Sequence, residues 1–235
     1  ICRNDLVIEI GAGRGALTRQ LVQQGAQVIA IELDPQLVAT LPKRLGHPPN
    51  LTVVEADGRK VDSSYLVPYG SKYKVVGNLP YYAANPILRR FLEASHPPML
   101  MVLTLQEEVA RNITATHGHM GLLSVAVQYY AKARLVCTVP PESFRPPPKV
   151  TSAVVRLDIL TNPAVQVADR EAFFAVVKSG FSAPRKQLKN SLAHGLDLPT
   201  QDIGQLLNGL GIDGRRRPAT LSLDEWSSIY SAREQ

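Results

Sequence analysis

The chain has 235 residues, of which 45% are hydrophobic, and it carries a formal net charge of +6 at pH 7. This length and composition suffice for a full hydrophobic core and allow one large domain with a smaller one. The positive charge favours a polyanionic partner. The sequence has no apolar stretch long enough to cross a bilayer, no internal repeat and no low-complexity segment, which argues against a membrane-spanning or repeat protein.

Strand and helix patterns alternate over the first two thirds of the chain. Strand-like apolar runs lie at residues 6–10, 27–31, 51–54, 73–77 and 99–104. Helical patterns lie between them, for example at residues 35–44 and 85–94. Such alternation predicts an α/β fold with a parallel sheet and helices on both faces.

The last two apolar strands, residues 135–139 and 151–159, are joined by a short loop without a crossover helix. We therefore predict that they pair antiparallel. A mostly parallel sheet with an antiparallel C-terminal hairpin is typical of the class I, Rossmann-like methyltransferase fold. Beyond residue 160 only helical patterns follow, at residues 169–180, 186–194, 201–208 and 223–230. The sequence thus predicts a catalytic domain over residues 1–160 and a small all-helical domain over residues 161–235.

A glycine-rich turn follows the first strand, with the pattern Gly11-x-Gly13-x-x-Ala16. Glu32 ends the second strand about 20 residues later, which is the layout of a nucleotide-binding α/β unit. Glycines there let a ligand approach the backbone, and the acid accepts hydrogen bonds from ribose hydroxyls. The same pattern also fits a dinucleotide-binding dehydrogenase or a tight turn without a ligand.

The segment Asn78-Leu79-Pro80-Tyr81 follows the fourth strand and combines groups that suit a planar amine. The Asn78 amide supplies an acceptor, Pro80 stiffens the turn, and Tyr81 offers a flat face for a base. Together with the glycine turn, this segment predicts methyl transfer to the exocyclic amine of a base. A DNA adenine methyltransferase would more typically carry an acid at residue 78, and a dehydrogenase would leave the segment without a role.

The sequence also contains a proline-rich segment at residues 140–150 and the segment Arg185-Lys186-x-Leu188-x-Asn190-Ser191-Leu192. In this combination the chain resembles the KsgA-type (RsmA) small-subunit rRNA adenine dimethyltransferases of the rRNA adenine N6-methyltransferase family, over essentially its whole length. The Asn-Leu-Pro-Tyr element also marks the Erm-type large-subunit rRNA methyltransferases, whereas the proline-rich segment and the Arg-Lys helix favour the KsgA type. The family carries a segment before the first strand, so we expect residues that precede Ile1.

The resemblance implies S-adenosylmethionine as cofactor, bound through six residues: Gly11, Gly13, Glu32, Leu33, Asp57 and Asn78. It places catalysis at Asn78, Leu79, Pro80 and Tyr81. The Asn78 amide and the Leu79 or Pro80 carbonyl would accept the two N–H bonds of the target adenine, so catalysis relies on positioning. Tyr81 and Phe144 would stack on the two faces of the base. Ordinary core packing of Phe144, and a loop role for Asp57, stay open as alternatives.

Several basic groups are candidates for contact with rRNA of the small subunit or its precursor. Arg185, Lys186 and Lys189 recur at helical spacing and would form a stripe for phosphates. A second cluster comprises Arg215, Arg216 and Arg217, with four more cations nearer the predicted pocket at Arg89, Arg90, Arg145 and Lys149. A solvated charged face is the alternative for each. No metal is expected, because the pair His117 and His119 lacks further ligands and fits a loop.

Cys2 and Cys137 lie far apart and form no metal or redox motif, which indicates reduced, buried thiols of an intracellular protein. We expect a cytoplasmic monomer without a membrane partner, and an organellar location stays open because a targeting signal would precede Ile1. The activity expected is dimethylation of adenines in small-subunit rRNA during ribosome biogenesis. Two alternatives stay open: an Erm-type enzyme of the large subunit, and a ribosome-assembly factor that has the fold without the turnover.

Overall fold

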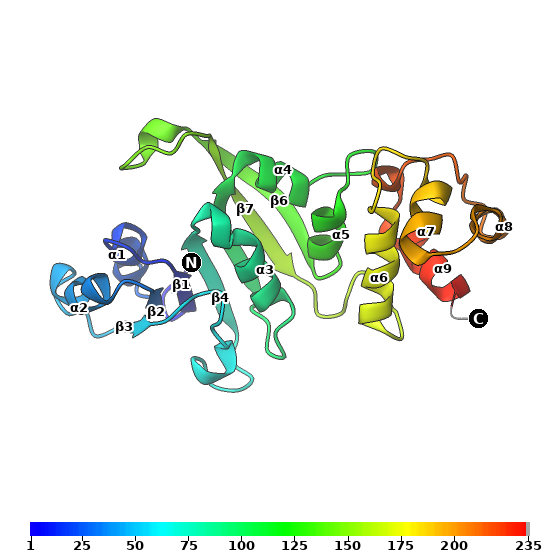
Figure 1. Cartoon of the computed structure of the whole chain (residues 1–235). Helices are drawn as coiled ribbons and strands as arrows, with labels where there is room; N and C mark the ends of the chain where they lie inside the picture. The colour runs from blue at the N-terminus through cyan, green and yellow to red at the C-terminus, as the bar shows by residue number, and fades with distance from the viewer. Residues whose placement is uncertain (234–235) are drawn as a thin grey trace. The chain divides into compact units, whose positions relative to one another are not determined.

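The computed structural model describes residues 1–233 and divides the chain into two compact units (Figure 1). Unit 1 comprises residues 1–110 and 132–160, and unit 2 comprises residues 111–131 and those from 161 onward. The segment 111–131 therefore clusters with the C-terminal helices although it precedes the last two strands in sequence. The division into a catalytic and a helical domain near residue 160 stays a prediction.

Unit 1 is built on a sheet of seven strands in the order β3-β2-β1-β4-β5-β7-β6. The strands are β1 (Leu6–Ile10), β2 (Gln27–Glu32), β3 (Leu51–Glu55), β4 (Tyr73–Asn78), β5 (Leu100–Gln106), β6 (Ala131–Val139) and β7 (Ser152–Ile159). The first five pair in parallel, and β7 pairs antiparallel with β5. This topology confirms the predicted Rossmann-like methyltransferase fold.

The strand order reverses its direction at β1, because β2 lies on one side of β1 and β4 on the other. In open α/β sheets, ligands bind beyond the carboxyl ends of the strands at such a switch point. The ends of β1 and β4 carry the two motifs identified in the sequence, the glycine turn and the segment that begins at Asn78. The topology therefore brings both motifs to one edge of the sheet.

Helices α1 (Ala16–Gln23), α2 (Pro35–Arg44) and α3 (Ala84–Leu92) connect the parallel strands. The N-terminus of α2 is specified locally, because the Asp34 side chain accepts a hydrogen bond from the Gln36 N–H and Pro35 supplies a preset φ. Leu21 of α1 and Leu41 of α2 pack with Val7 and Val28 of the sheet in one buried cluster. This packing fixes the strand ends from which the site is built. Helix α4 (Glu107–Ile113) follows β5 directly.

Unit 2 contains helices α5 (Leu122–Gln128), α6 (Arg170–Gly180), α7 (Leu188–Leu196), α8 (Thr200–Gly209) and α9 (Leu223–Arg233). Their buried side chains form one core around the fully buried Trp226 and Phe173. Two glycines let the helices approach closely: a Cβ at Gly180 would lie 2.3 Å from the Trp226 ring, and one at Gly195 would lie 2.5 Å from the Ser179 backbone. No helix within residues 1–233 is both long and apolar enough to span a membrane.

The predicted burial of the two cysteines is wrong. Both thiols are free, as expected, but Cys2 and Cys137 are both exposed. Cys2 precedes β1, and Cys137 lies on β6 at the edge of the sheet, where residues 134–138 are all exposed. An apolar strand pattern predicts a strand here, but an edge strand does not bury its residues as a central strand does.

Candidate active site

The glycine turn, residues 11–15, leaves β1 in a backbone conformation that L side chains rarely adopt. Gly11, Gly13 and Gly15 have φ angles of 74°, 56° and 85°. The N–H groups of Gly11 and Ala12 donate to the Ile31 carbonyl at 2.9 and 3.3 Å, which ties the turn to β2. A Cβ built at Gly13 would meet no atom within 4 Å. At Gly13 the turn therefore presents bare backbone to open space, as a site for a nucleotide-like ligand requires.

Glu32 is held by the backbone at the end of β2. Its Oε2 accepts a hydrogen bond from the Gly13 N–H at 2.8 Å, and its Oε1 accepts from the N–H groups of Leu33 and Asp34 at 2.8 and 3.0 Å. These hydrogen bonds orient the carboxylate against the glycine turn. Leu33 beside it leaves 55% of its surface exposed, which is unusual for leucine and provides an apolar face at the same edge.

Asp57 follows β3 and lies near Glu32 in the fold, because the Ala56 N–H donates to the Glu32 carbonyl at 3.0 Å. Two N–H groups of the Arg59 guanidinium donate hydrogen bonds to the Asp57 carboxylate, at 2.9 and 2.6 Å. These hydrogen bonds lower the pKa of Asp57 to about 2. Asp57 is therefore an ionised acceptor at the predicted edge, and it also has a partner within its own loop.

Glu9 is a buried acid to which the sequence analysis gave no role. It lies on β1, one residue before the strand ends, and only 1% of its surface is exposed. Burial raises its pKa to about 7, with a smaller contribution from the Glu32 charge. Its Oε2 has no hydrogen-bond partner within residues 1–233. The signal in the sequence is a single acid inside an otherwise apolar strand.

The segment Asn78–Tyr81 lies beside the glycine turn. A Cβ at Gly11 would lie 3.8 Å from the Asn78 carbonyl oxygen. Gly77 permits this approach, since a Cβ there would lie 2.7 Å from the Ile10 carbonyl oxygen. The Asn78 side chain is exposed at the end of β4, whereas Leu79 is buried and its N–H donates to the Thr104 carbonyl at 3.2 Å.

Pro80 caps a short 3₁₀ turn, Tyr81–Ala83, that follows Leu79. The Pro80 carbonyl accepts a hydrogen bond from the Ala83 N–H at 2.9 Å. The Tyr81 ring is half-buried, and its hydroxyl lies 2.8 Å from the hydroxyl oxygen of Ser152 on β7. Phe144 is half-buried in the loop between β6 and β7, which projects beyond the strands in Figure 1. Its stacking role stays a prediction.

Comparison with known proteins identifies the family. Residues 1–233 match the sequence model of ribosomal RNA adenine dimethylase. The chain belongs to this family. Membership makes it an enzyme, an rRNA adenine dimethyltransferase, and the dehydrogenase interpretation of the glycine turn does not apply.

Curated relatives agree with this assignment. The chain is 42% identical over 225 residues to ribosomal RNA small subunit methyltransferase A of Dehalococcoides mccartyi, which covers 96% of this chain and 77% of the relative. The corresponding protein of Desulfitobacterium hafniense is 43% identical over 228 residues, with 96% of this chain and 81% of the relative covered.

Solved structures of similar fold include two enzymes. The 23S rRNA methyltransferase ErmE superposes with a TM-score of 0.76 at 29% identity, covering 100% of this chain and 93% of its own. A dimethyladenosine transferase from Plasmodium falciparum gives a TM-score of 0.80 at 24% identity, with 97% and 90% covered. The second similarity concerns the fold alone.

Six of the ten basic residues predicted to contact RNA lie in unit 2, in the first turn of α7 and in the two segments at residues 185–186 and 215–217. The N–H groups of Leu188 and Lys189 donate to the carbonyls of Arg216 and Gly214 at 2.7 and 3.1 Å. These bonds join the loop of the second basic cluster to the helix of the first. Arg185 and Lys186 are exposed just before that helix, and Lys189 is half-buried within its first turn.

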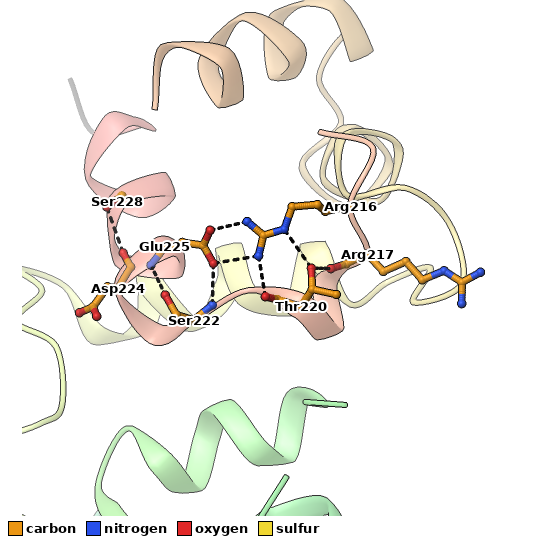
Figure 2. Close-up of polar contacts among 7 residues, drawn as sticks. All are labelled: Arg216, Arg217, Thr220, Ser222, Asp224, Glu225 and Ser228. Atoms are coloured by element: carbon orange, nitrogen blue, oxygen red, sulfur yellow. Dashed lines mark hydrogen bonds and ion pairs between the residues drawn. The ribbon is translucent and has the colours of Figure 1, made fainter. Parts of the chain in front are cut away.

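The three consecutive arginines, residues 215–217, differ in their surroundings, and Figure 2 shows the last two of them. Arg215 pairs with Asp213 at 3.1 Å. Arg216 pairs with Glu225, and its guanidinium also donates to the Thr220 hydroxyl at 3.1 Å, so it anchors the start of α9. Arg217 is exposed and extends away from this cluster in Figure 2. Among the four candidate cations of unit 1, Arg89 pairs with Glu93 and Arg90 with Asp62.

The described residues 1–233 contain no group of three or more His, Cys, Asp or Glu side chains arranged to hold a metal. His117 and His119 lie in a turn of unit 2, whose neighbours Gly118 and Met120 donate to the Ala219 carbonyl at 3.0 and 3.2 Å.

Proposed function

We propose that the protein transfers methyl groups from S-adenosylmethionine to the exocyclic amine of adenines in small-subunit rRNA during ribosome biogenesis. The observation that carries this proposal is the contact between the glycine turn and the Asn78–Tyr81 segment, in which a Cβ at Gly11 would lie 3.8 Å from the Asn78 carbonyl oxygen. A methyl donor on the turn and an amine at Asn78 would then be neighbours. The small-subunit substrate is supported by relatives of that name at 42% identity, against 29% for the large-subunit enzyme ErmE.

The residues at this edge fit the cofactor chemically. The backbone at Gly11 and Gly13 suits the methionine and ribose parts, and Glu32 Oε2, which within residues 1–233 accepts only from the Gly13 N–H, keeps a lone pair for a ribose hydroxyl. The exposed Leu33 side chain would cover one face of the cofactor's adenine, and Asp57 would accept from its amino group. When bound, S-adenosylmethionine supplies a methyl group on a positively charged sulfur. Asp57 can take its role only if one of its oxygens turns from Arg59 toward the ligand.

The target adenine would be held by two acceptors at the end of β4. The Asn78 amide oxygen would be one of them, because Asn78 is the last residue of β4 and its side chain is exposed. The Pro80 carbonyl already accepts from the Ala83 N–H, which favours the Leu79 carbonyl as the second acceptor. Two such acceptors orient the amine so that its lone pair can face the methyl donor. No strong base is needed, since a methylated amine that carries a positive charge loses its extra proton readily.

A second methylation places a further demand on the site. The monomethylated amine has one N–H left, so one of the two acceptors loses its partner. The base must then be held largely by stacking, on Tyr81 and, as we propose, on Phe144. The rate of the second transfer should therefore depend more strongly on stacking by Tyr81 and Phe144 than the rate of the first.

The test is to incubate the protein with labelled S-adenosylmethionine and small-subunit particles that lack the modification. Digested nucleosides are then analysed by mass spectrometry, with protein-free large-subunit RNA as the comparison substrate. We expect dimethyladenosine from the particles and none from the large-subunit RNA.

Each alternative function predicts a different result. Methylation of the large-subunit RNA in preference to the particles would favour an Erm-type enzyme. Measurable cofactor binding without any methylated adenosine would favour a ribosome-assembly factor that keeps the fold. A variant such as Asn78→Ala, which removes one acceptor, should abolish product, and it serves as the control for contaminating activity.

A further inference from the structure

Three strand ends meet beside the proposed adenine site. Asn78 at the end of β4 is in register with Thr104, and Gln106 at the end of β5 is in register with Ser152. Because β7 runs antiparallel to β5, the carboxyl end of β5 meets the first residue of β7. Ser152 thus faces the edge that carries the Asn78–Tyr81 segment, although 71 positions of sequence separate it from Tyr81.

A single polar contact joins the Tyr81 ring to this strand. The Tyr81 hydroxyl oxygen lies 2.8 Å from the Ser152 hydroxyl oxygen, which is hydrogen-bond distance. Ser152 is fully buried, with 0% of its surface exposed. Its position is fixed by its pairing in the ladder and by its neighbour Thr151, whose carbonyl accepts from the Glu107 N–H at 3.0 Å. The partner of the Tyr81 hydroxyl is therefore a rigid one.

We propose that Ser152 is a positioning residue for methyl transfer, which sets the plane of the Tyr81 ring against which the target adenine stacks. The hydroxyl lies at the end of the side chain farthest from the backbone, so a hydrogen bond there restricts both torsions of the tyrosine. Without it the half-buried ring can swing while the 3₁₀ turn stays in place. This inference rests on the stacking role of Tyr81 in the proposed function.

The geometry also predicts which step depends on Ser152. The first transfer has two acceptors that hold the adenine amine, and the second has one. Ring orientation therefore matters more for the second transfer. A buried serine that merely satisfies its hydrogen bond would affect stability and would leave the ratio of the two products unchanged.

The experiment compares Ser152→Ala, Tyr81→Phe and the double variant. Both single changes remove the same hydrogen bond, and Tyr81→Phe keeps the ring. We expect each to slow the second methylation by about 3- to 10-fold relative to the first, the range of one net hydrogen bond. The double variant should be no slower than the more affected single variant, because the two residues act as one unit. Rates of monomethyl- and dimethyladenosine formation on small-subunit particles are the measurement.

Ser63→Ala is the matched control. Ser63 is a buried serine of the same unit, 2% exposed, whose hydroxyl donates to the His96 carbonyl at 3.2 Å. This variant should lower thermal stability without changing the ratio of the two products. Cofactor affinity should be unchanged in all variants, because Ser63, Tyr81 and Ser152 are not among the residues predicted to bind the cofactor.

The inference and the proposed function fail in different ways. Independent, multiplicative effects of Ser152→Ala and Tyr81→Phe, or equal slowing of both transfers, would overturn the positioning role. Tyr81→Ala separates the two hypotheses: if it harms the second transfer while Ser152→Ala and Tyr81→Phe do not, only the positioning role is lost. If Tyr81→Ala itself leaves both transfers intact, the stacking role fails and the inference with it.

Discussion

In the proposed reaction, Tyr81 both stacks on the target base and needs a fixed ring orientation. We propose that its half-buried ring stacks on the target base, and its hydroxyl lies 2.8 Å from the Ser152 hydroxyl oxygen of β7. We expect Tyr81→Ala to reduce the second methylation more than the first, by about tenfold or more, because base–aromatic stacking contributes roughly 1–3 kcal/mol. The measurement is the time course of monomethyl- and dimethyladenosine on small-subunit particles. An equal loss of both products would contradict this prediction.

Glu9 makes stability depend on pH around neutrality. Burial raises its pKa from 4.5 to about 7, so between these pH values the folded chain holds a proton that the unfolded chain has lost. The free energy of unfolding should therefore fall as pH rises from 4.5 to 7, by up to about 3 kcal/mol. This fall in the free energy of unfolding ends above pH 7, where Glu9 is ionised in both the folded and the unfolded chain.

The variant Glu9→Gln removes this titration and should abolish that part of the fall. Urea unfolding at several pH values between 4.5 and 8 measures it, and the difference between the two proteins isolates Glu9 from the histidines. Asp57 does not interfere, because its lowered pKa, about 2, confines its contribution to more acidic conditions. Identical slopes for the two proteins would show that the Glu9 carboxyl titrates normally.

At the scale of the elements, close approach of backbones decides where glycine is required. A Cβ added at Gly195 of α7 would lie 2.5 Å from the Ser179 Cα. A Cβ added at Gly204 of α8 would have no atom within 4 Å. Both glycines lie inside helices. The same substitution should therefore have opposite effects at the two positions.

We expect Gly195→Ala to destabilise the protein by about 1–3 kcal/mol, because the backbone of α6 must move to make room. Gly204→Ala should stabilise it by roughly 0.5–1 kcal/mol through helix propensity. Urea denaturation of both variants provides the measurement, and each serves as the other's control. A destabilised Gly204→Ala would mean that α8 packs against something at that position.

At the scale of the whole molecule, the excess positive charge should act through exposed cations of unit 2. Charge reversal at Arg185 and Lys186, to glutamate, should weaken binding to small-subunit particles steeply and lower its dependence on salt, because fewer counterions are released from the RNA. Cofactor affinity should stay the same. Filter binding across salt concentrations, with calorimetry for the cofactor, tests both statements.

The neutral double variant Asp213→Asn with Arg215→Gln is the control for this prediction. Arg215 is paired with Asp213, so removing both leaves the net charge and the free cations unchanged. Particle affinity at moderate salt should stay near that of the natural protein. If the reversed variant binds as tightly as this control, Arg185 and Lys186 do not contact RNA.

The sequence alone determined the sheet and both motifs of the site. Its alternating patterns located each strand to within a few residues, since the strands of a sheet covered on both faces read as apolar runs. The helix over residues 35–44 was likewise predictable, because Asp34 and Pro35 start it locally. The glycine turn and Asn78–Tyr81 were recognised because their residue types are required by backbone conformation and by ligand chemistry, which are local properties.

Only the tertiary structure decided which distant residues meet. The sequence does not show that Ser152 contacts Tyr81, because this contact arises from the register of β7 against β5. The exposure of Cys137 follows from the edge position of β6, and the inclusion of residues 111–131 in unit 2 follows from packing around a shared core. Likewise, the three arginines at 215–217 look equivalent in sequence, and their acidic partners distinguish them. Local patterns specify elements and motifs, whereas pairing, burial and charge neutralisation depend on contacts that form only when the chain folds.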